Sequence, residues 1–191
     1  MSLGDLPGIQ VTLADLPLRD DLRGKSPYGA PQLDVPVRLN TNENPYPPLP
    51  RVVKVIEEAA HHVNRYPDPG STELIDAIAA HAGVPRDHVA VATGAVALCY
   101  QFAQSTCGPG DEVLFAWRSF EAYPIVASVA GARPVAVPLT SGGRHDLLAL
   151  AAAVTPQTRL IFVCSPNNPT GTVVTQLELD AFMAAVPSDV M

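Results

Sequence analysis

The sequence predicts an α/β fold in which a parallel sheet is covered by helices on both faces. From about residue 88 onward, short apolar runs alternate with stretches of helical periodicity. These runs are apolar throughout, as in strands that are buried on both sides. Glycine and proline residues stand where the intervening helices should end. Together these three observations favour helices packed on both sides of one parallel sheet.

The part of the chain before residue 88 is organised differently. Residues 1–50 have little periodicity and many prolines, so we expect an irregular N-terminal arm. Two helices should follow, over about residues 50–63 and 71–82, because apolar residues recur there at helical spacing. Pro50 suits the first position of a helix, and Gly83 suits the position just after the end of one.

The alternating part of the chain supplies the predicted sheet. Four strands are expected, at residues 89–92, 112–115, 134–137 and 160–163. The helices that accompany them are expected at about residues 94–107, 124–130, 146–154 and 175–186. Asp146 is a suitable cap for the third of these helices, and Thr175 with Glu178 forms a capping box for the last.

Composition excludes several classes of protein. The net charge is −7 and no basic cluster is present, which argues against nucleic acid as a main partner. No apolar run approaches the roughly 18 residues of a transmembrane helix, and the N-terminus lacks the pattern of a secretory signal. The cysteines, 3 in number, lie in apolar settings, and the histidines show no metal-ligand spacing. We therefore expect a cytoplasmic protein with reduced thiols, no membrane segment and no metal site.

Polar residues follow the last predicted strand at the point where it ends. This segment reads Ser165-Pro166-Asn167-Asn168-Pro169-Thr170-Gly171. In open α/β sheets, ligands bind at the carboxyl ends of the strands, so the segment is a candidate binding site. The alternative is an ordinary surface turn, because Asn, Pro and Gly are the usual turn residues.

Two further segments should reach the same edge of the sheet. Gly94 stands between the first predicted strand and its helix, where backbone N–H groups and the helix dipole attract an anion. Phe120 follows the second predicted strand and could stack on a flat ligand. A tight turn at Gly94 and a core aromatic at Phe120 are the alternatives. We predict that Gly94, Phe120 and Asn168 converge at one edge.

Three motifs give the chain a resemblance to a known family. They are Leu39-Asn40-Thr41-Asn42-Glu43-Asn44-Pro45, Arg65-Tyr66-Pro67-Asp68 and the segment Ser165 to Gly171. From about Val11 to its last residue, the chain resembles the fold-type I pyridoxal-5′-phosphate aminotransferases, and among them the histidinol-phosphate aminotransferases. The resemblance implies an aspartate aminotransferase-like large domain, pyridoxal 5′-phosphate as cofactor, and a small-molecule amino donor and a 2-oxo acid as substrates.

The resemblance also implies roles for individual residues. Asn168 would hydrogen-bond the phenolic oxygen of the cofactor, and Phe120 would stack on the pyridine ring, where the family usually has Tyr. The backbone of Gly94, Ala95 and Val96 would hold the phosphate, although related enzymes often have an acidic residue at the Val96 position. Tyr66 would reach the phosphate of the partner subunit's cofactor, which implies a homodimer. Tyr28 and Asn42 match segments that fold over the substrate.

Other functional residues of the family have no match up to Met191. They are the Schiff-base Lys, an Asp that pairs with the pyridine nitrogen and an Arg for the substrate carboxylate. We therefore expect the Schiff-base Lys beyond Met191 and no catalytic residue within this chain, because Lys25 and Lys54 lie away from any strand end. By this resemblance residues 1–50 form the arm and a small-domain segment, and residues 51–191 form an incomplete, truncated large domain. The 191-residue polypeptide alone is expected not to transaminate.

The resemblance leaves the substrate open between two amino donors. The Pro-Tyr-Gly and Asn-Glu-Asn-Pro segments of the arm favour histidinol phosphate with 2-oxoglutarate, hence a role in histidine biosynthesis. Residues 117–121 and the non-acidic Val96 favour an aromatic amino acid such as phenylalanine. A non-catalytic aminotransferase-like protein or the ligand domain of a transcription regulator is a further alternative, but the arm lacks a basic helix-turn-helix. A nicotinamide dehydrogenase would need two more glycines after Gly94.

Overall fold

The computed structural model describes residues 17–23, 34–37 and 41–191, and these divide into two compact units. One unit comprises Thr106–Met191 with the described residues of Met1–Pro27, and the other comprises the described residues of Tyr28–Ser105. The predicted domain boundary at residue 50 stays a prediction.

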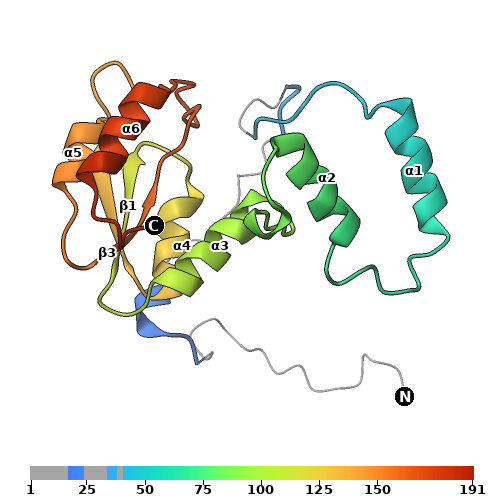
Figure 1. Ribbon diagram of the computed structural model, residues 1–191, viewed down its shortest axis with the longest axis horizontal. Coiled ribbons are helices and arrows are strands. Elements are labelled where there is room, and N and C mark those ends of the chain that lie inside the picture. Colours follow the sequence, from blue (N-terminus) through green and yellow to red (C-terminus); the bar gives the residue numbers. More distant parts are fainter. Residues whose placement is uncertain (1–16, 24–33, 38–40) are drawn as a thin grey trace. The chain divides into compact units, whose positions relative to one another are not determined.

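The first unit is built on a three-stranded parallel sheet. Its strands are β1 (Glu112–Trp117), β2 (Arg133–Pro138) and β3 (Thr158–Phe162), in the order β2-β1-β3. Leu114, in the middle of β1, is in register with Val135 on one side and Ile161 on the other. Three of the four predicted strands and their parallel arrangement are thus confirmed (Figure 1).

The fourth predicted strand, at residues 89–92, is wrong. Val89 has an extended backbone (φ −117°, ψ 124°), yet in the described parts of the chain residues 89–92 pair with no strand. A strand is stabilised by its hydrogen-bonded ladder and by cross-strand side-chain contacts. An apolar, extended segment without a neighbouring strand therefore does not become part of a sheet.

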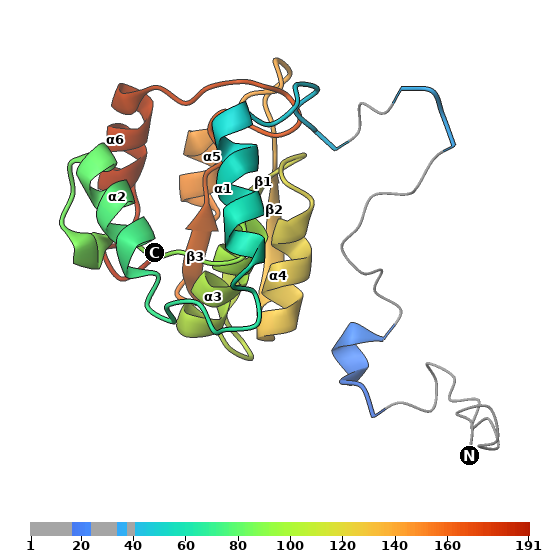
Figure 2. The ribbon, with the colours of Figure 1, turned by 90° about the vertical axis from the view of Figure 1, so that its right-hand side faces the viewer.

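Helices cover the two faces of the sheet, as Figures 1 and 2 show. On one face lies α4 (Ala122–Ala130), whose Tyr123 ring stacks on Phe162 of β3 with centroids 4.3 Å apart. On the other face lie α5 (Leu147–Ala152) and α6 (Gln176–Ala185), whose apolar side chains pack against Leu114. Residues Leu114 and Phe115 point to opposite faces because successive side chains of a strand alternate.

The connections of β1 and β3 leave the sheet in opposite directions. After β1 the chain enters α4 on one face, whereas after β3 it enters α6 on the other. Adjacent parallel strands whose connections diverge in this way form a topological switch point, and ligands of open α/β sheets bind beside it. This edge, at the carboxyl ends of β1 and β3, is therefore where a ligand is expected to bind.

Local signals in the sequence place several helix ends correctly. Asp146 caps α5, because its Oδ1 accepts a hydrogen bond of 2.9 Å from the Ala149 N–H. Thr175 and Glu178 form the predicted capping box of α6, and Gly131 ends α4 with a φ of 88°. The caps of α5 and α6 fix where the loops from the carboxyl edge end, and Gly131 begins the short connection to the amino end of β2.

Glu112, the first residue of β1, is a buried carboxylate at the opposite, amino end of the sheet. Its Oε2 accepts hydrogen bonds from the hydroxyls of Thr155 (2.8 Å) and Thr158 (3.4 Å), and its Oε1 is paired with the Arg133 guanidinium. Burial alone would raise the pKa of the Glu112 carboxyl. The hydrogen bonds from Thr155 and Arg133, with the Arg133 charge, outweigh burial, so the pKa of Glu112 lies below its usual range.

Glu112 should therefore make the stability of the protein depend on pH. A carboxyl whose pKa falls on folding binds fewer protons in the folded state, so its contribution is present above about pH 4.3 and is lost as pH falls through the folded-state pKa. In urea unfolding of the full-length protein, Glu112→Gln should be less stable than wild type at about pH 7, and the difference should shrink below about pH 4. A difference that stays constant across this range would contradict the assignment.

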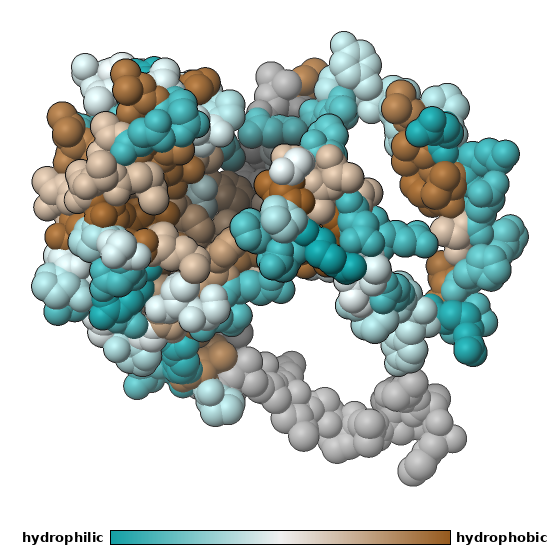
Figure 3. Space-filling view, in the orientation of Figure 1, coloured by the Kyte–Doolittle hydropathy of each residue, from teal (hydrophilic) through white to brown (hydrophobic). Residues whose placement is uncertain are grey.

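The second unit is helical in the part of the chain that the structure describes. It contains α1 (Pro50–Ala60), α2 (Thr72–Ala82), the 3-10 turn η3 (Arg86–His88) and most of α3 (Ala95–Thr106). As predicted, Pro50 begins α1 and Gly83 follows the end of α2 in the left-handed conformation. The apolar side chains of α1 are exposed, and Figure 3 shows apolar surface along this helix.

Composition also gave expectations about membrane helices and about the cysteines, which can be compared with the structure. Within residues 17–23, 34–37 and 41–191, no helix combines the length and the apolar character needed to cross a membrane. Cys99, Cys107 and Cys164 form no disulfide, in line with the predicted reduced thiols, and all three are half-buried. Burial raises the pKa of the Cys107 thiol.

Candidate functional site

The loops that follow β1 and β3 are joined by a buried side-chain hydrogen bond. The Ser119 hydroxyl donates to Oδ1 of Asn167 over 2.7 Å, and both residues are almost completely buried. The Asn167 amide nitrogen donates to the Arg118 carbonyl over 3.2 Å. Phe120 and Asn168, the next residues in the two loops, therefore both lie in loops at the carboxyl edge. The predicted convergence with Gly94 stays a prediction, because Gly94 belongs to the second unit.

Phe120 is supported by the aromatic side chains of the α4 face. Its half-buried ring meets the Tyr123 ring edge to face, with centroids 5.5 Å apart and an interplanar angle of 89°. Tyr123 in turn stacks on Phe162. Contacts of this kind orient a ring beyond what area burial alone does. Phe120 is thus a core contact, and the exposed part of its ring offers a surface on which a flat ligand can stack.

Asn168 lies in a turn that several hydrogen bonds hold, but its own side-chain amide takes part in none of them. Gly171 N–H donates to the Asn167 carbonyl over 2.7 Å, and the Thr170 hydroxyl donates to the Gly143 carbonyl over 2.8 Å. The Asn168 side chain is half-buried and makes no hydrogen bond to any described residue. A rigid loop that presents an unpaired amide at a strand's carboxyl end is suited to hydrogen-bonding a ligand.

Gly94 and the start of α3 have the geometry of an anion site, within the second unit. Gly94 has a φ of 95°, a conformation that suits glycine, and its carbonyl accepts from the N–H groups of Ala97 and Leu98. The N–H groups of Ala95 and Val96 find no acceptor among the described residues. Free N–H groups at the start of a helix, together with its dipole, bind phosphate or carboxylate.

The other predicted residues lie in the second unit or outside the described residues. Tyr66 is fully exposed and lies two residues before Asp68, whose carboxylate accepts from the N–H groups of Gly70 (2.9 Å) and Thr72 (2.7 Å). The Thr72 hydrogen bonds hold the pKa of Asp68 below its usual range. Asn42 is exposed with a φ of 54°. Tyr28 lies outside the described residues, and the roles of all these residues stay predictions.

The sequence analysis gave no role to two residues of this edge, Ser119 and His145. The His145 ring lies with Nε2 3.1 Å from Oδ1 of Asn167 and is also buried. Its only signal in the sequence is its place directly before Asp146, the cap of α5, where a histidine looks like an ordinary loop residue. Histidines tested only for metal-ligand spacing do not reveal such a contact.

Comparison with known proteins identifies relatives of the chain. The family model for "Aminotransferase class I and II" matches residues 35–190. An aromatic amino acid aminotransferase of Streptomyces coelicolor is 54% identical over 179 residues, covering 91% of this chain and 50% of that protein. One of Corynebacterium glutamicum is 56% identical over 154 residues, covering 81% and 45%.

A solved structure extends the comparison to the fold. The histidinol-phosphate aminotransferase of Sinorhizobium meliloti, in complex with pyridoxal-5′-phosphate, matches with a TM-score of 0.74 and 28% identity, over 79% of this chain and 41% of that one. This match confirms the predicted fold. The chain spans about half the length of the curated relatives that it matches. Because the family model covers most of the chain, the chain belongs to the class I and II aminotransferases.

Proposed function

We propose that the full-length protein is a pyridoxal-phosphate-dependent aminotransferase that moves an amino group between an aromatic amino acid and a 2-oxo acid. The observation that carries the proposal is the 54% identity, over 91% of this chain, to an aromatic amino acid aminotransferase. Identity to the histidinol-phosphate aminotransferase of known structure is much lower, at 28%. The stated alternative of the sequence analysis is therefore the better supported reading.

The described residues fit the proposed cofactor. The unpaired Asn168 amide suits a hydrogen bond to the phenolic oxygen, and the half-buried Phe120 ring suits stacking on the pyridine. The free N–H groups of Ala95 and Val96, with the conformation of Gly94, suit a phosphate. When bound, the cofactor supplies the electron sink of the reaction, and these residues would bind and orient it.

A homodimer completes the proposal. The Tyr66 side chain is fully exposed, although burying a large aromatic side chain is favourable. It lies two residues before Asp68, whose carboxylate fixes the turn that follows. We propose that Tyr66 reaches the phosphate of the partner subunit's cofactor, and that Tyr28 and Asn42 contact the substrate.

Histidinol phosphate is the second candidate donor, favoured by the similarity to the Sinorhizobium meliloti structure and by the motifs of the arm. The full-length protein, loaded with pyridoxal 5′-phosphate, should be assayed with 2-oxoglutarate and each of phenylalanine, tyrosine and histidinol phosphate. We expect kcat/KM for the aromatic donors to exceed that for histidinol phosphate. The reverse order would favour histidinol-phosphate transamination, and no turnover with any donor would favour the non-catalytic alternative.

A further inference from the structure

The Asn167 side chain is the meeting point of three loops. Its amide nitrogen donates to the Arg118 carbonyl in the loop after β1 and to the Thr170 hydroxyl in its own loop, over 3.2 and 2.8 Å. Its Oδ1 is 2.7 Å from the Ser119 hydroxyl and 3.1 Å from Nε2 of His145, in the loop between β2 and α5. One buried amide therefore ties together the carboxyl ends of all three strands.

Hydrogen-bond chemistry fixes the orientation of this amide and the tautomer of the histidine. The Arg118 carbonyl can only accept, so the atom that faces it must be the amide nitrogen of Asn167. The other atom is then the Asn167 oxygen, which can only accept, so His145 must carry a proton on Nε2. Nδ1 of His145 is buried without a partner among the described residues, so it contributes no competing bond.

We propose that Asn167 is a positioning residue of the cofactor site, with Ser119 and His145 as the two donors that hold its oxygen. Ser119 is followed by Phe120 and Asn167 by Asn168, so this contact sets the spacing between the stacking ring and the amide of the proposed function. The inference rests on the proposed binding of pyridoxal phosphate. A buried acceptor that loses a donor is costly, so removing His145 should loosen the Asn167 loop.

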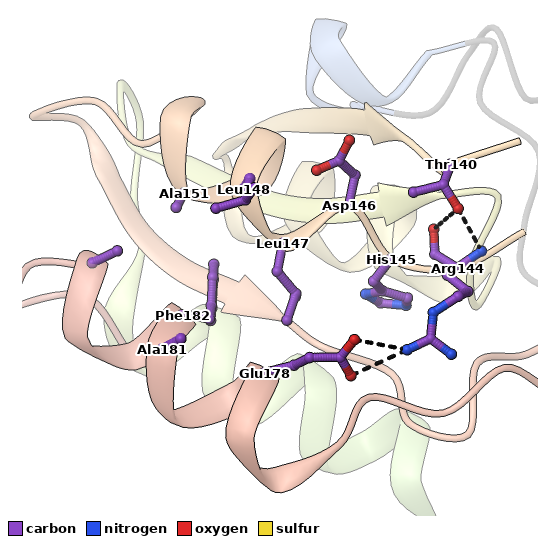
Figure 4. A pocket seen from close by; sticks show the side chains of 11 residues that line it. Thr140, Arg144, His145, Asp146, Leu147, Leu148, Ala151, Glu178, Ala181 and Phe182 are labelled. Carbon is purple, nitrogen blue, oxygen red and sulfur yellow. Dashed lines mark hydrogen bonds and ion pairs between the residues drawn. The ribbon is translucent and has the colours of Figure 1, made fainter. Parts of the chain in front are cut away.

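The chain offers a matched control beside His145. Figure 4 shows Arg144 on the same loop, with its guanidinium paired to Glu178 of α6 over 2.9 and 3.1 Å. Both residues line a cavity of about 390 Å³ between α5 and α6. Arg144→Gln therefore perturbs the same loop and cavity without removing a donor to Asn167.

The test uses the full-length protein and three readouts. The apoprotein of each variant is titrated with pyridoxal 5′-phosphate, the visible circular dichroism of the loaded protein is recorded, and hydrogen exchange of residues 118–121 is followed in the apoprotein. His145→Leu should weaken cofactor binding about tenfold, alter the dichroism and speed exchange. His145→Gln, which keeps a donor, should stay within about threefold of wild type, as should Arg144→Gln.

The outcomes separate this inference from the proposed function. A wild-type protein that does not bind pyridoxal phosphate overturns both. A wild-type protein that binds, together with a His145→Leu variant that matches Arg144→Gln in cofactor affinity and dichroism, overturns the positioning role alone. If His145→Leu does not fold, Ser119→Ala removes the other donor to the same oxygen, and wild-type affinity and dichroism in that variant would equally overturn the role.

Discussion

Truncation of Leu114 to alanine is expected to lower the free energy of unfolding by about 3–4 kcal/mol. Leu114 is fully buried in the central strand β1, where it packs with Val137, Leu150 and Phe182. Neighbouring strands on both sides hold the backbone, so the cavity left by the missing side chain cannot collapse. The measurement is urea unfolding of the full-length protein, followed by hydrogen exchange of the β1 amides.

Leu148 provides the matched control for Leu114. It is also a leucine of this unit, on α5, but it is 86% exposed. Leu148→Ala should change the free energy of unfolding by no more than about 0.5 kcal/mol. Equal destabilisation by the two substitutions would show that the α5 and α6 face is not the core of this unit.

Replacing Asn168 with alanine is expected to lower kcat/KM of the full-length aminotransferase roughly 10- to 150-fold. Under the proposed function, the substitution removes a hydrogen bond to a charged oxygen of the cofactor, and such bonds contribute about 1.5–3 kcal/mol. It should leave the fold intact, because the Asn168 side chain bonds to no described residue. The assay pairs phenylalanine with 2-oxoglutarate, and the visible spectrum of the bound cofactor is recorded in parallel.

An exposed amide elsewhere in the chain distinguishes a specific effect from a general one. Gln104, in the last turn of α3, is exposed, so Gln104→Ala should retain wild-type kcat/KM and the wild-type spectrum. An Asn168→Ala protein that is as active as Gln104→Ala would remove Asn168 from the site. Asn168→Gln keeps the amide but moves it by a methylene, so its activity should lie between wild type and Asn168→Ala.

Local chemistry explains the parts of the fold that the sequence predicts well. The strands at 112–115, 134–137 and 160–163 are predominantly apolar runs bounded by turn residues, and each has a neighbour to pair with. The capping box of Thr175 and Glu178 depends on residues only three apart, so the sequence contains the whole motif. Residues 89–92 carry the same apolar signal, but strand formation depends on a pairing partner that no local pattern encodes.

In the candidate site, too, local patterns could be predicted from the sequence and long-range contacts could not. Phe120 and Asn168 could be placed at one edge from their positions after parallel strands alone. The contact of His145 with Asn167 joins residues 22 apart, and depends on how the β2 and β3 loops fold back over the sheet. The motifs also could not identify the substrate. Asn-Glu-Asn-Pro and Pro-Asn-Asn-Pro-Thr-Gly indicate the family, but they do not include the residues of the pocket that selects the amino donor.

The strand order β2-β1-β3 has a consequence for how this unit forms on the ribosome. β1 and β2 lie close in sequence and can pair first. The other edge of β1 then stays unpaired until β3 and the segment of Asn167 have been synthesised. At about 5–20 residues per second, the chain from Trp117 to Asn167 takes several seconds to synthesise. The apolar α5 and α6 face of β1 is exposed during this interval, which is when a chaperone would meet the nascent chain.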